Sequence, residues 1–246
     1  MKYHSRTSLI LGFLMNIGLL YSEFSNTNLS SEFDFGIVLI AAATSIAFCT
    51  LATEFLFKEN YLSIFSLPVC LAMLVLSSIA RGKIAGGHFF HPWLMAHLLA
   101  SFSGESLFAL AAISSASYLY VVRRLKKKNR LKAVAIFPPL TRLDNLTFKL
   151  LAIGTITFFI GLAIGIYGNF NYFNGLQPTG KHYLSAIVLG YYTGILALKR
   201  TLNIAGPRLA IASLIGFLLS LVLIVFPSNQ LHWQPFIPDT GIGVPK

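Results

Sequence analysis

The sequence predicts an all-α fold, a polytopic transmembrane bundle of about seven helices. Hydrophobic residues make up 55% of the 246 positions and charged residues only 11%, with a mean hydropathy of +0.71. Soluble domains carry about 25% charged residues, so this chain cannot cover a surface that faces water. Apolar runs close to the roughly 20 residues that cross a bilayer recur along the chain, and in lipid such runs must be helical. We expect residues 1–246 to form a single integral membrane domain.

The apolar runs place the expected spans at 8–22, 35–57, 61–80, 92–122, 146–167, 182–198 and 209–226. Lys2 and Arg6 before the first run resemble the start of a signal peptide. No small-x-small cleavage site follows them cleanly, so we expect an uncleaved first span. The fourth run is long enough to extend past the bilayer at its C-terminal end.

Positive charges indicate the orientation, because Lys and Arg in short loops stay on the cytoplasmic side. The basic groups that share one predicted side are Lys2 with Arg6, Lys58, the 123–142 linker, and Lys199 with Arg200 and Arg208. Acidic residues are concentrated on the other side, where Arg81 and Lys83 are exceptions. The pattern predicts a cytoplasmic N-terminus and a C-terminus outside.

The formal net charge of +11 does not indicate nucleic acid as a partner. Most basic residues lie in short connections between apolar runs, where they set orientation and contact anionic membrane lipid. The two cysteines, Cys49 and Cys70, lie inside apolar runs and are expected to be buried. The chain lacks nucleophile, metal-cluster and phosphate-binding motifs, so we do not expect an enzyme.

Two histidines are candidate metal ligands at the outer side. His97 lies about one and a half turns into the fourth span, with Trp93 one turn nearer the outside on the same face. His182 opens the sixth span at similar depth. Two imidazoles at one level on different helices can hold haem iron from both sides. The alternative is that these His and Trp side chains simply anchor helices at the headgroup level.

An aromatic segment at 168–175, which includes Phe170 and Tyr172, is expected to be an outer loop between the fifth and sixth spans. Its rings could form an apolar surface for a planar macrocycle. They could equally be an ordinary aromatic belt.

Two acidic residues lie within spans. Glu105 is near mid-bilayer, where an ionised carboxylate costs about 2.5–3.5 kcal/mol on insertion scales. It is either a proton or cation relay, or a cofactor-tuning group, or a protonated side chain bonded to a neighbouring helix. A transporter built on Glu105 is disfavoured, since no inverted repeat is evident. Glu54 is near the cytoplasmic end of its span and is expected to extend toward the surface.

Several ordered pieces resemble the cytochrome c assembly (CcsA/CcmC-type) family, and within it the short YpjD- and HemX-like branch. They are His97-Leu-Leu-Ala-Ser-Phe-Ser, Pro138-Pro-Leu-Thr-Arg-Leu-Asp144, Gly161-Leu-Ala-Ile-Gly165 and Lys181-His-Tyr-Leu-Ser-Ala-Ile. The resemblance covers residues 91–226. His97 falls where the first flanking histidine of the family belongs, and Lys181 where a lysine follows the family's tryptophan-rich segment. That segment here, 167–181, has no Trp, and Glu105 replaces an aromatic residue of the branch.

The resemblance implies a haem-handling accessory protein of cytochrome c maturation in the bacterial inner membrane. It would hold haem at the outer face with His97 and His182 as axial ligands, and Trp93, Phe170 and Tyr172 against the macrocycle. Implied partners are other assembly proteins or an apocytochrome. The alternative is a non-haem scaffold or regulatory protein that docks a cytoplasmic partner through the basic 123–142 linker.

Overall fold

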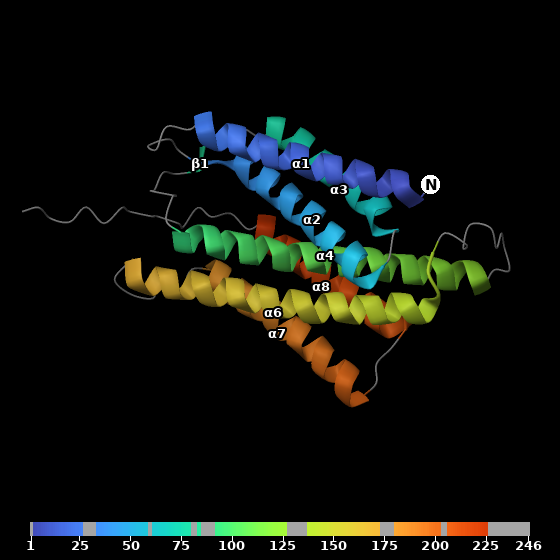
Figure 1. The fold of residues 1–246 in the computed structure, drawn as a ribbon. Coiled ribbons are helices and arrows are strands. Elements are labelled where there is room, and N and C mark those ends of the chain that lie inside the picture. The colour runs from blue at the N-terminus through green and yellow to red at the C-terminus, as the bar shows by residue number, and fades with distance from the viewer. Residues whose placement is uncertain are drawn as a thin grey trace, which may run out of the picture.

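The computed structural model describes residues 2–26, 33–58, 61–79, 83–84, 92–126, 137–172, 180–202 and 206–225. These residues form seven α-helices and two very short strands (Figure 1). In chain order the elements are α1 (Lys2–Asn26), β1 (Phe33–Asp34), α2 (Phe35–Phe57), α3 (Leu62–Ile79), β2 (Lys83–Ile84), α4 (Pro92–Lys126), α6 (Leu140–Tyr172), α7 (Gly180–Leu202) and α8 (Pro207–Val225).

Each expected span coincides with a different helix, so the all-α prediction is confirmed for the described part of the chain. Among the described residues, four helical segments are long and apolar enough to cross a membrane: Gly36–Phe57, Leu62–Ile79, Ala96–Lys126 and Leu140–Gly168. Two shorter apolar segments, Ile10–Ser22 and Pro207–Val222, accompany them. The protein is a membrane protein.

Helix α6 begins at Leu140, earlier than the expected 146, because Pro139 starts it. The Pro139 carbonyl accepts hydrogen bonds from the amides of Arg142 (2.9 Å) and Leu143 (3.1 Å). Proline is well suited to this position, since it pre-sets the backbone and lacks an amide that would need a partner. The polar first turns of α6 therefore extend the helix beyond its apolar run.

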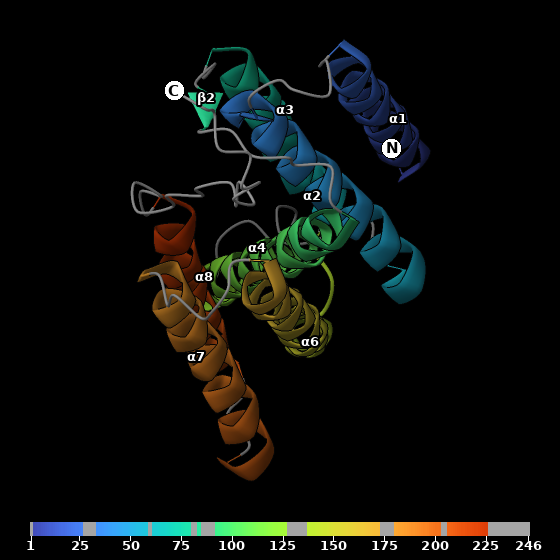
Figure 2. The same ribbon diagram turned by 90° about the vertical axis from the view of Figure 1, so that its left-hand side faces the viewer.

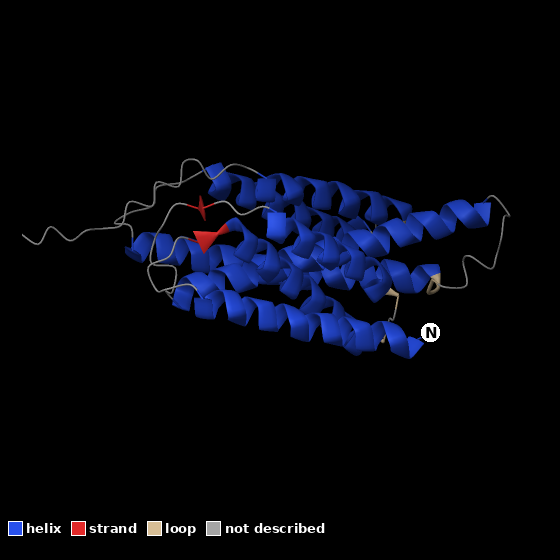
Figure 3. Ribbon diagram, turned by 90° about the horizontal axis from the view of Figure 1, so that it is seen from above, coloured by secondary structure: helices blue, strands red, loops and turns tan. Residues whose placement is uncertain are grey.

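The two strands form an antiparallel pair that the hydropathy pattern did not predict. Phe33 pairs with Ile84 and Asp34 with Lys83. The pair lies at the end of the bundle opposite the start of α1 (Figure 3). It joins the chain just before α2 to the chain just after α3.

The helices are arranged around α4, which packs against α6, α8, α2 and α3. Helices α1, α2 and α3 form a group on one side, while α7 lies against α6 and α8 on the other (Figures 1 and 2). The main core contains Phe108 and Leu110 of α4, Leu150 of α6 and Tyr192 of α7, all fully buried. A smaller core between α2 and α3 includes Cys70, and both cysteines are buried and free, as expected.

Small residues let α4 and α6 approach closely along an antiparallel seam. The positions that meet are His97 with Gly165, Ser101 with Gly161, Gly104 with Phe158, and Phe108 with Gly154. A Cβ added at Gly104 would lie 2.8 Å from the Cβ of Phe158. Membrane helices associate through such close backbone packing, because lipid supplies no hydrophobic drive between them.

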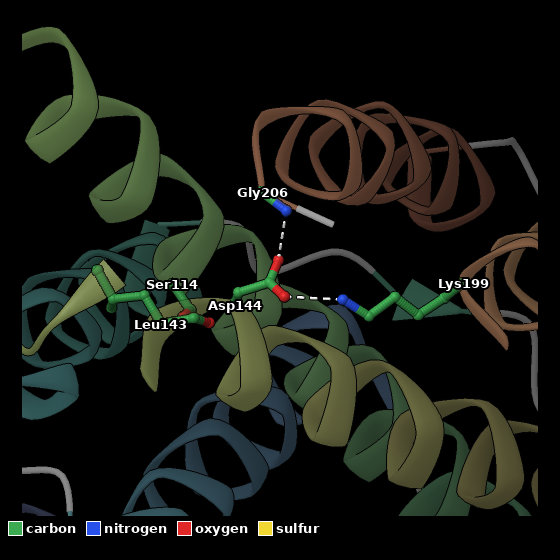
Figure 4. A network of polar contacts seen from close by, with 5 residues as sticks. All are labelled: Ser114, Leu143, Asp144, Lys199 and Gly206. Carbon is green, nitrogen blue, oxygen red and sulfur yellow. Dashed lines mark hydrogen bonds and ion pairs between the residues drawn. The ribbon is translucent and has the colours of Figure 1, made fainter. Parts of the chain in front are cut away.

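Asp144 fastens α6 to α7 and α8 at the end of the bundle that carries the basic residues (Figure 4). Its Oδ2 accepts a hydrogen bond from Lys199 Nζ at 2.7 Å, and its Oδ1 accepts a hydrogen bond from the Gly206 amide at 2.7 Å. Gly206 has a φ of +65°, a conformation that suits glycine, and Pro207 begins α8 directly after it. One carboxylate thus fixes the relative placement of three helices.

The prediction that Glu54 extends to the surface is wrong. Its side chain is only 1% exposed, and its Oε1 accepts from the Ser63 amide at 2.9 Å, in the first turn of α3. A carboxylate at a helix N-terminus satisfies an amide that has no partner within the helix and interacts favourably with the helix dipole. Glu54 therefore joins the end of α2 to the start of α3.

Candidate functional site

His97 lies in the second turn of α4, with its ring against α6. Its Nδ1 is 2.7 Å from the carbonyl oxygen of Gly161. A carbonyl can only accept, so Nδ1 carries the proton of this hydrogen bond. In the neutral ring Nε2 then holds the free lone pair. Metal-binding histidines use this arrangement, in which one nitrogen bonds to the protein and the other faces the metal.

Gly165 of α6 makes room for this ring, and Gly161 makes room for the next turn of α4. A Cβ at Gly165 would lie 2.6 Å from His97 Cε1 and 2.7 Å from Nδ1, which is closer than real Cβ contacts allow. One turn earlier, a Cβ at Gly161 would lie 2.7 Å from Ser101 Oγ. Sequence reasoning did not assign these glycines to the site. Their Gly-x-x-x-Gly spacing, which is typical of close helix contacts in membranes, was a usable signal.

His182 lies in the first turn of α7 and is partly buried. It interacts electrostatically with His97, so the two imidazoles lie near each other although they are 85 residues apart in sequence. The ends of α4 and α7 that carry them lie at the same end of the bundle (Figure 1). The two predicted ligands therefore lie on two different helices at the same end of the bundle (Figure 1).

Of the three aromatic candidates, the structure describes the side chain of only one. Trp93 is in the first turn of α4 and Tyr172 ends α6, but both side chains lie outside the described residues. Phe170, in the last turn of α6, is 59% exposed. The prediction of a loop from residue 168 onward is wrong as far as Tyr172, because α6 continues to that residue. Positions 170 and 172 are then about 200° apart around the helix axis, and residues 173–175 lie outside the described part.

The two histidines suit a metal that needs only two protein ligands. Among the described residues, no group of three or more His, Cys, Asp or Glu side chains could hold a bare metal ion. Structural zinc takes four protein ligands and catalytic zinc three. Haem differs, because the macrocycle supplies four nitrogens and the protein only the axial ligands. A pair of imidazoles therefore matches the two positions that haem leaves to protein ligands.

The fold and this pair of histidines define a polytopic helical membrane protein with a candidate ligand site at the end opposite most of its described basic residues. A family model described as cytochrome C assembly protein matches residues 4–233, so the chain belongs to this family. The match includes α1, α2 and α3, whereas the resemblance seen in the residues began at position 91. Comparisons with curated proteins and with solved structures found no match. Family membership supports a role in cytochrome c maturation.

Proposed function

We propose that this protein is a haem-holding accessory factor of cytochrome c maturation, with His97 and His182 as the axial ligands. The observation that carries the proposal is the hydrogen bond from His97 Nδ1 to Gly161, which leaves the Nε2 lone pair available for a ligand, together with the electrostatic interaction of His97 with His182. Membership in the cytochrome C assembly family supports haem as the cargo. Haem contributes an iron that accepts two further ligands.

The role of the chain's own residues is to bind and orient, not to catalyse. Gly161 fixes the tautomer and the direction of the His97 ring, while Gly165 lets that ring lie against α6. Phe170, exposed at the end of α6, can contact the apolar face of a macrocycle. The protein would make and break coordination bonds only, and would pass its cargo to an apocytochrome or another assembly protein.

The distribution of charge supports a site on the outer face of a bacterial inner membrane. Basic residues gather where α4 and α7 end and where α6 and α8 begin: Arg123, Arg124, Lys126, Arg142, Lys199, Arg200 and Arg208. The bond from Asp144 to Gly206 places the start of α8 at this end, and α1 begins there too (Figure 1). Since such residues stay in the cytoplasm, the histidines at the opposite end face outward. The N-terminus is then cytoplasmic and the C-terminus outside.

Haem titration of the detergent-purified protein tests this function. We expect a Soret band that saturates at one haem per chain and is strongly reduced in His97→Ala and in His182→Ala. His4→Ala is the matched control, because His4 precedes the first span on the predicted cytoplasmic side. Titrations that are identical in the wild type and all three variants would overturn the proposal.

A further inference from the structure

A second polar site lies within the bundle, where α4, α7 and α8 meet. Both carboxyl oxygens of Glu105 are buried and have no hydrogen-bond partner among the described residues. The same is true of the hydroxyl of Tyr192, whose side chain is 0% exposed. Tyr192 interacts electrostatically with Glu105, and the hydroxyl of Ser220 lies beside both. Buried polar groups are nearly always hydrogen-bonded, so a neighbouring pair without partners needs a physical reason.

The hydrogen bond made by Ser220 decides the protonation state that fits this site. Ser220 Oγ donates its single proton to the Phe217 carbonyl at 3.0 Å. It therefore presents only lone pairs to Glu105. An ionised Glu105 would place acceptor against acceptor. A proton on Glu105 removes the conflict, because the carboxyl O–H can then donate to Ser220.

The same proton also gives Tyr192 a partner. The carbonyl oxygen of a protonated Glu105 accepts from the Tyr192 hydroxyl. The result is a continuous chain of donors that runs from Tyr192 to Glu105, then to Ser220 and the Phe217 carbonyl. Side-chain rotations that close these contacts would give every polar atom in the group a partner. No atom outside the protein is needed except one proton.

We propose that Glu105 is a membrane-embedded proton-binding site, completed by Tyr192 and Ser220. The site lies on α4, α7 and α8 and does not depend on haem. The sequence indicated Glu105 as a proton relay or a protonated side chain, but it could not indicate Tyr192 and Ser220, because the three residues come from different helices with no local pattern.

No described cationic side chain neutralises Glu105. Tyr192 from α7 is the titratable group that faces it, and the neighbouring Tyr191 donates to the Ala212 carbonyl at 2.9 Å. From α2 the nearby titratable group is the Cys49 thiol, which lies 3.7 Å from the Ser103 carbonyl. Helix α6 contributes Phe158 and Gly154 next to this part of α4. One positive charge neutralises one carboxylate, so a divalent cation at this site would leave an excess of positive charge.

Infrared spectroscopy of the full-length protein in lipid vesicles tests the proposal. We expect a C=O stretching band of a protonated carboxyl group at neutral pH, lost in Glu105→Gln. It should persist in Glu54→Gln, the matched control at the other buried carboxylate. In Tyr192→Phe it should move to higher frequency, because the carbonyl loses a donor. If no such band appears at any pH at which the protein stays folded, the carboxyl group is ionised and the proposal fails.

Covalent labelling of the wild-type chain gives a second readout that needs no folded variant. Dicyclohexylcarbodiimide reacts with protonated carboxyl groups in apolar surroundings. The acid O–H adds across one C=N bond, and the adduct rearranges to a stable N-acylurea with no other reagent. Mass spectrometry should find the label on Glu105, with equal yield in sodium chloride and in choline chloride. Protection by sodium alone would show that the site holds a sodium ion, and would overturn the assignment to a proton.

Discussion

At the scale of single residues, the account depends on how His97 is held. The residue type and its depth in the fourth span were enough to predict a candidate ligand. Its orientation was not predictable, because that depends on two glycines 64 and 68 residues further along the chain. Gly161 supplies the acceptor for Nδ1, and Gly165 supplies the space for the ring.

Gly165→Ala should disturb haem binding without touching either proposed ligand. The new methyl group would overlap the His97 ring at 2.6 Å, so the imidazole must turn away from Gly161 or the helices must separate. We expect a clear loss of haem affinity and a loss of unfolding free energy of about 1–3 kcal/mol, as overpacking usually costs. Haem titration and thermal unfolding in detergent measure the two effects.

Gly190→Ala provides the control for this change. Nothing lies within 4 Å of a Cβ at Gly190, so the added methyl group should leave both haem affinity and stability unchanged or slightly improved. Equal losses in the two variants would show that the contact with His97 is not the cause.

At the scale of elements, hydropathy predicted the presence and order of the seven helices in the described part of the chain, because apolar runs of this length have few other structures in lipid. The polar ends were harder to predict. Helix α6 extends to Leu140 at one end and to Tyr172 at the other through residues that are not apolar enough to reveal it. The register of α4 against α6 was also hidden, since it is set by small residues that meet across two distant segments.

Gly104→Ala tests the α4–α6 seam away from the histidines. The added Cβ would meet the Phe158 Cβ at 2.8 Å and its backbone at 2.9 Å, and neither atom can move without shifting a helix. We expect a loss of about 1–3 kcal/mol in unfolding free energy. Gly194→Ala, on α7 with nothing within 4 Å of its Cβ, should lose nothing. Unfolding by denaturant in mixed micelles compares them, and equal stability of the two variants would contradict the close seam.

Two substitutions separate the contributions of the two contacts that Asp144 makes. Asp144→Asn removes the charge opposite Lys199 but keeps an oxygen for the Gly206 amide, whereas Asp144→Ala removes both contacts. Because the pair is largely buried, we expect Asp144→Ala to cost about 1–3 kcal/mol and Asp144→Asn less.

Arg200→Met, an exposed change one residue from Lys199, is the control for both and should stay within about 0.5 kcal/mol of the wild type. Thermal unfolding in detergent measures all three. An Asp144→Ala protein as stable as the control would show that this carboxylate does not fasten the helices.

At the scale of the whole molecule, the sequence predicted which end of the bundle faces which side. The basic residues indicated the cytoplasmic end, and the histidines indicated a candidate site at the outer end. The structure gathers most of the described basic residues of α4, α6, α7 and α8 at a single end, whereas Lys181 lies beside His182 in the first turn of α7. What the sequence could not supply is the grouping of helices, with α1 to α3 on one side of α4 and α7 on the other (Figure 2). This grouping arises from contacts between segments that are distant in sequence. One example is the stacking of Phe108 of α4 on Tyr192 of α7, with the ring centroids 3.8 Å apart.

Reporter fusions at Lys246 test the orientation. A C-terminus outside the cytoplasm should make an alkaline phosphatase fusion active and a green fluorescent protein fusion dark, because each reporter matures on only one side. The same reporters fused before Met1 should give the reverse result. A fluorescent C-terminal fusion would place the two histidines in the cytoplasm.

The ligation of haem by two imidazoles is the central claim, and electron paramagnetic resonance of the ferric, haem-loaded protein tests it most directly. We predict a low-spin signal typical of two histidine ligands in the wild type, replaced by a high-spin signal in both His97→Ala and His182→Ala. A high-spin signal in the wild type, or a low-spin signal unchanged in either variant, would contradict the claim.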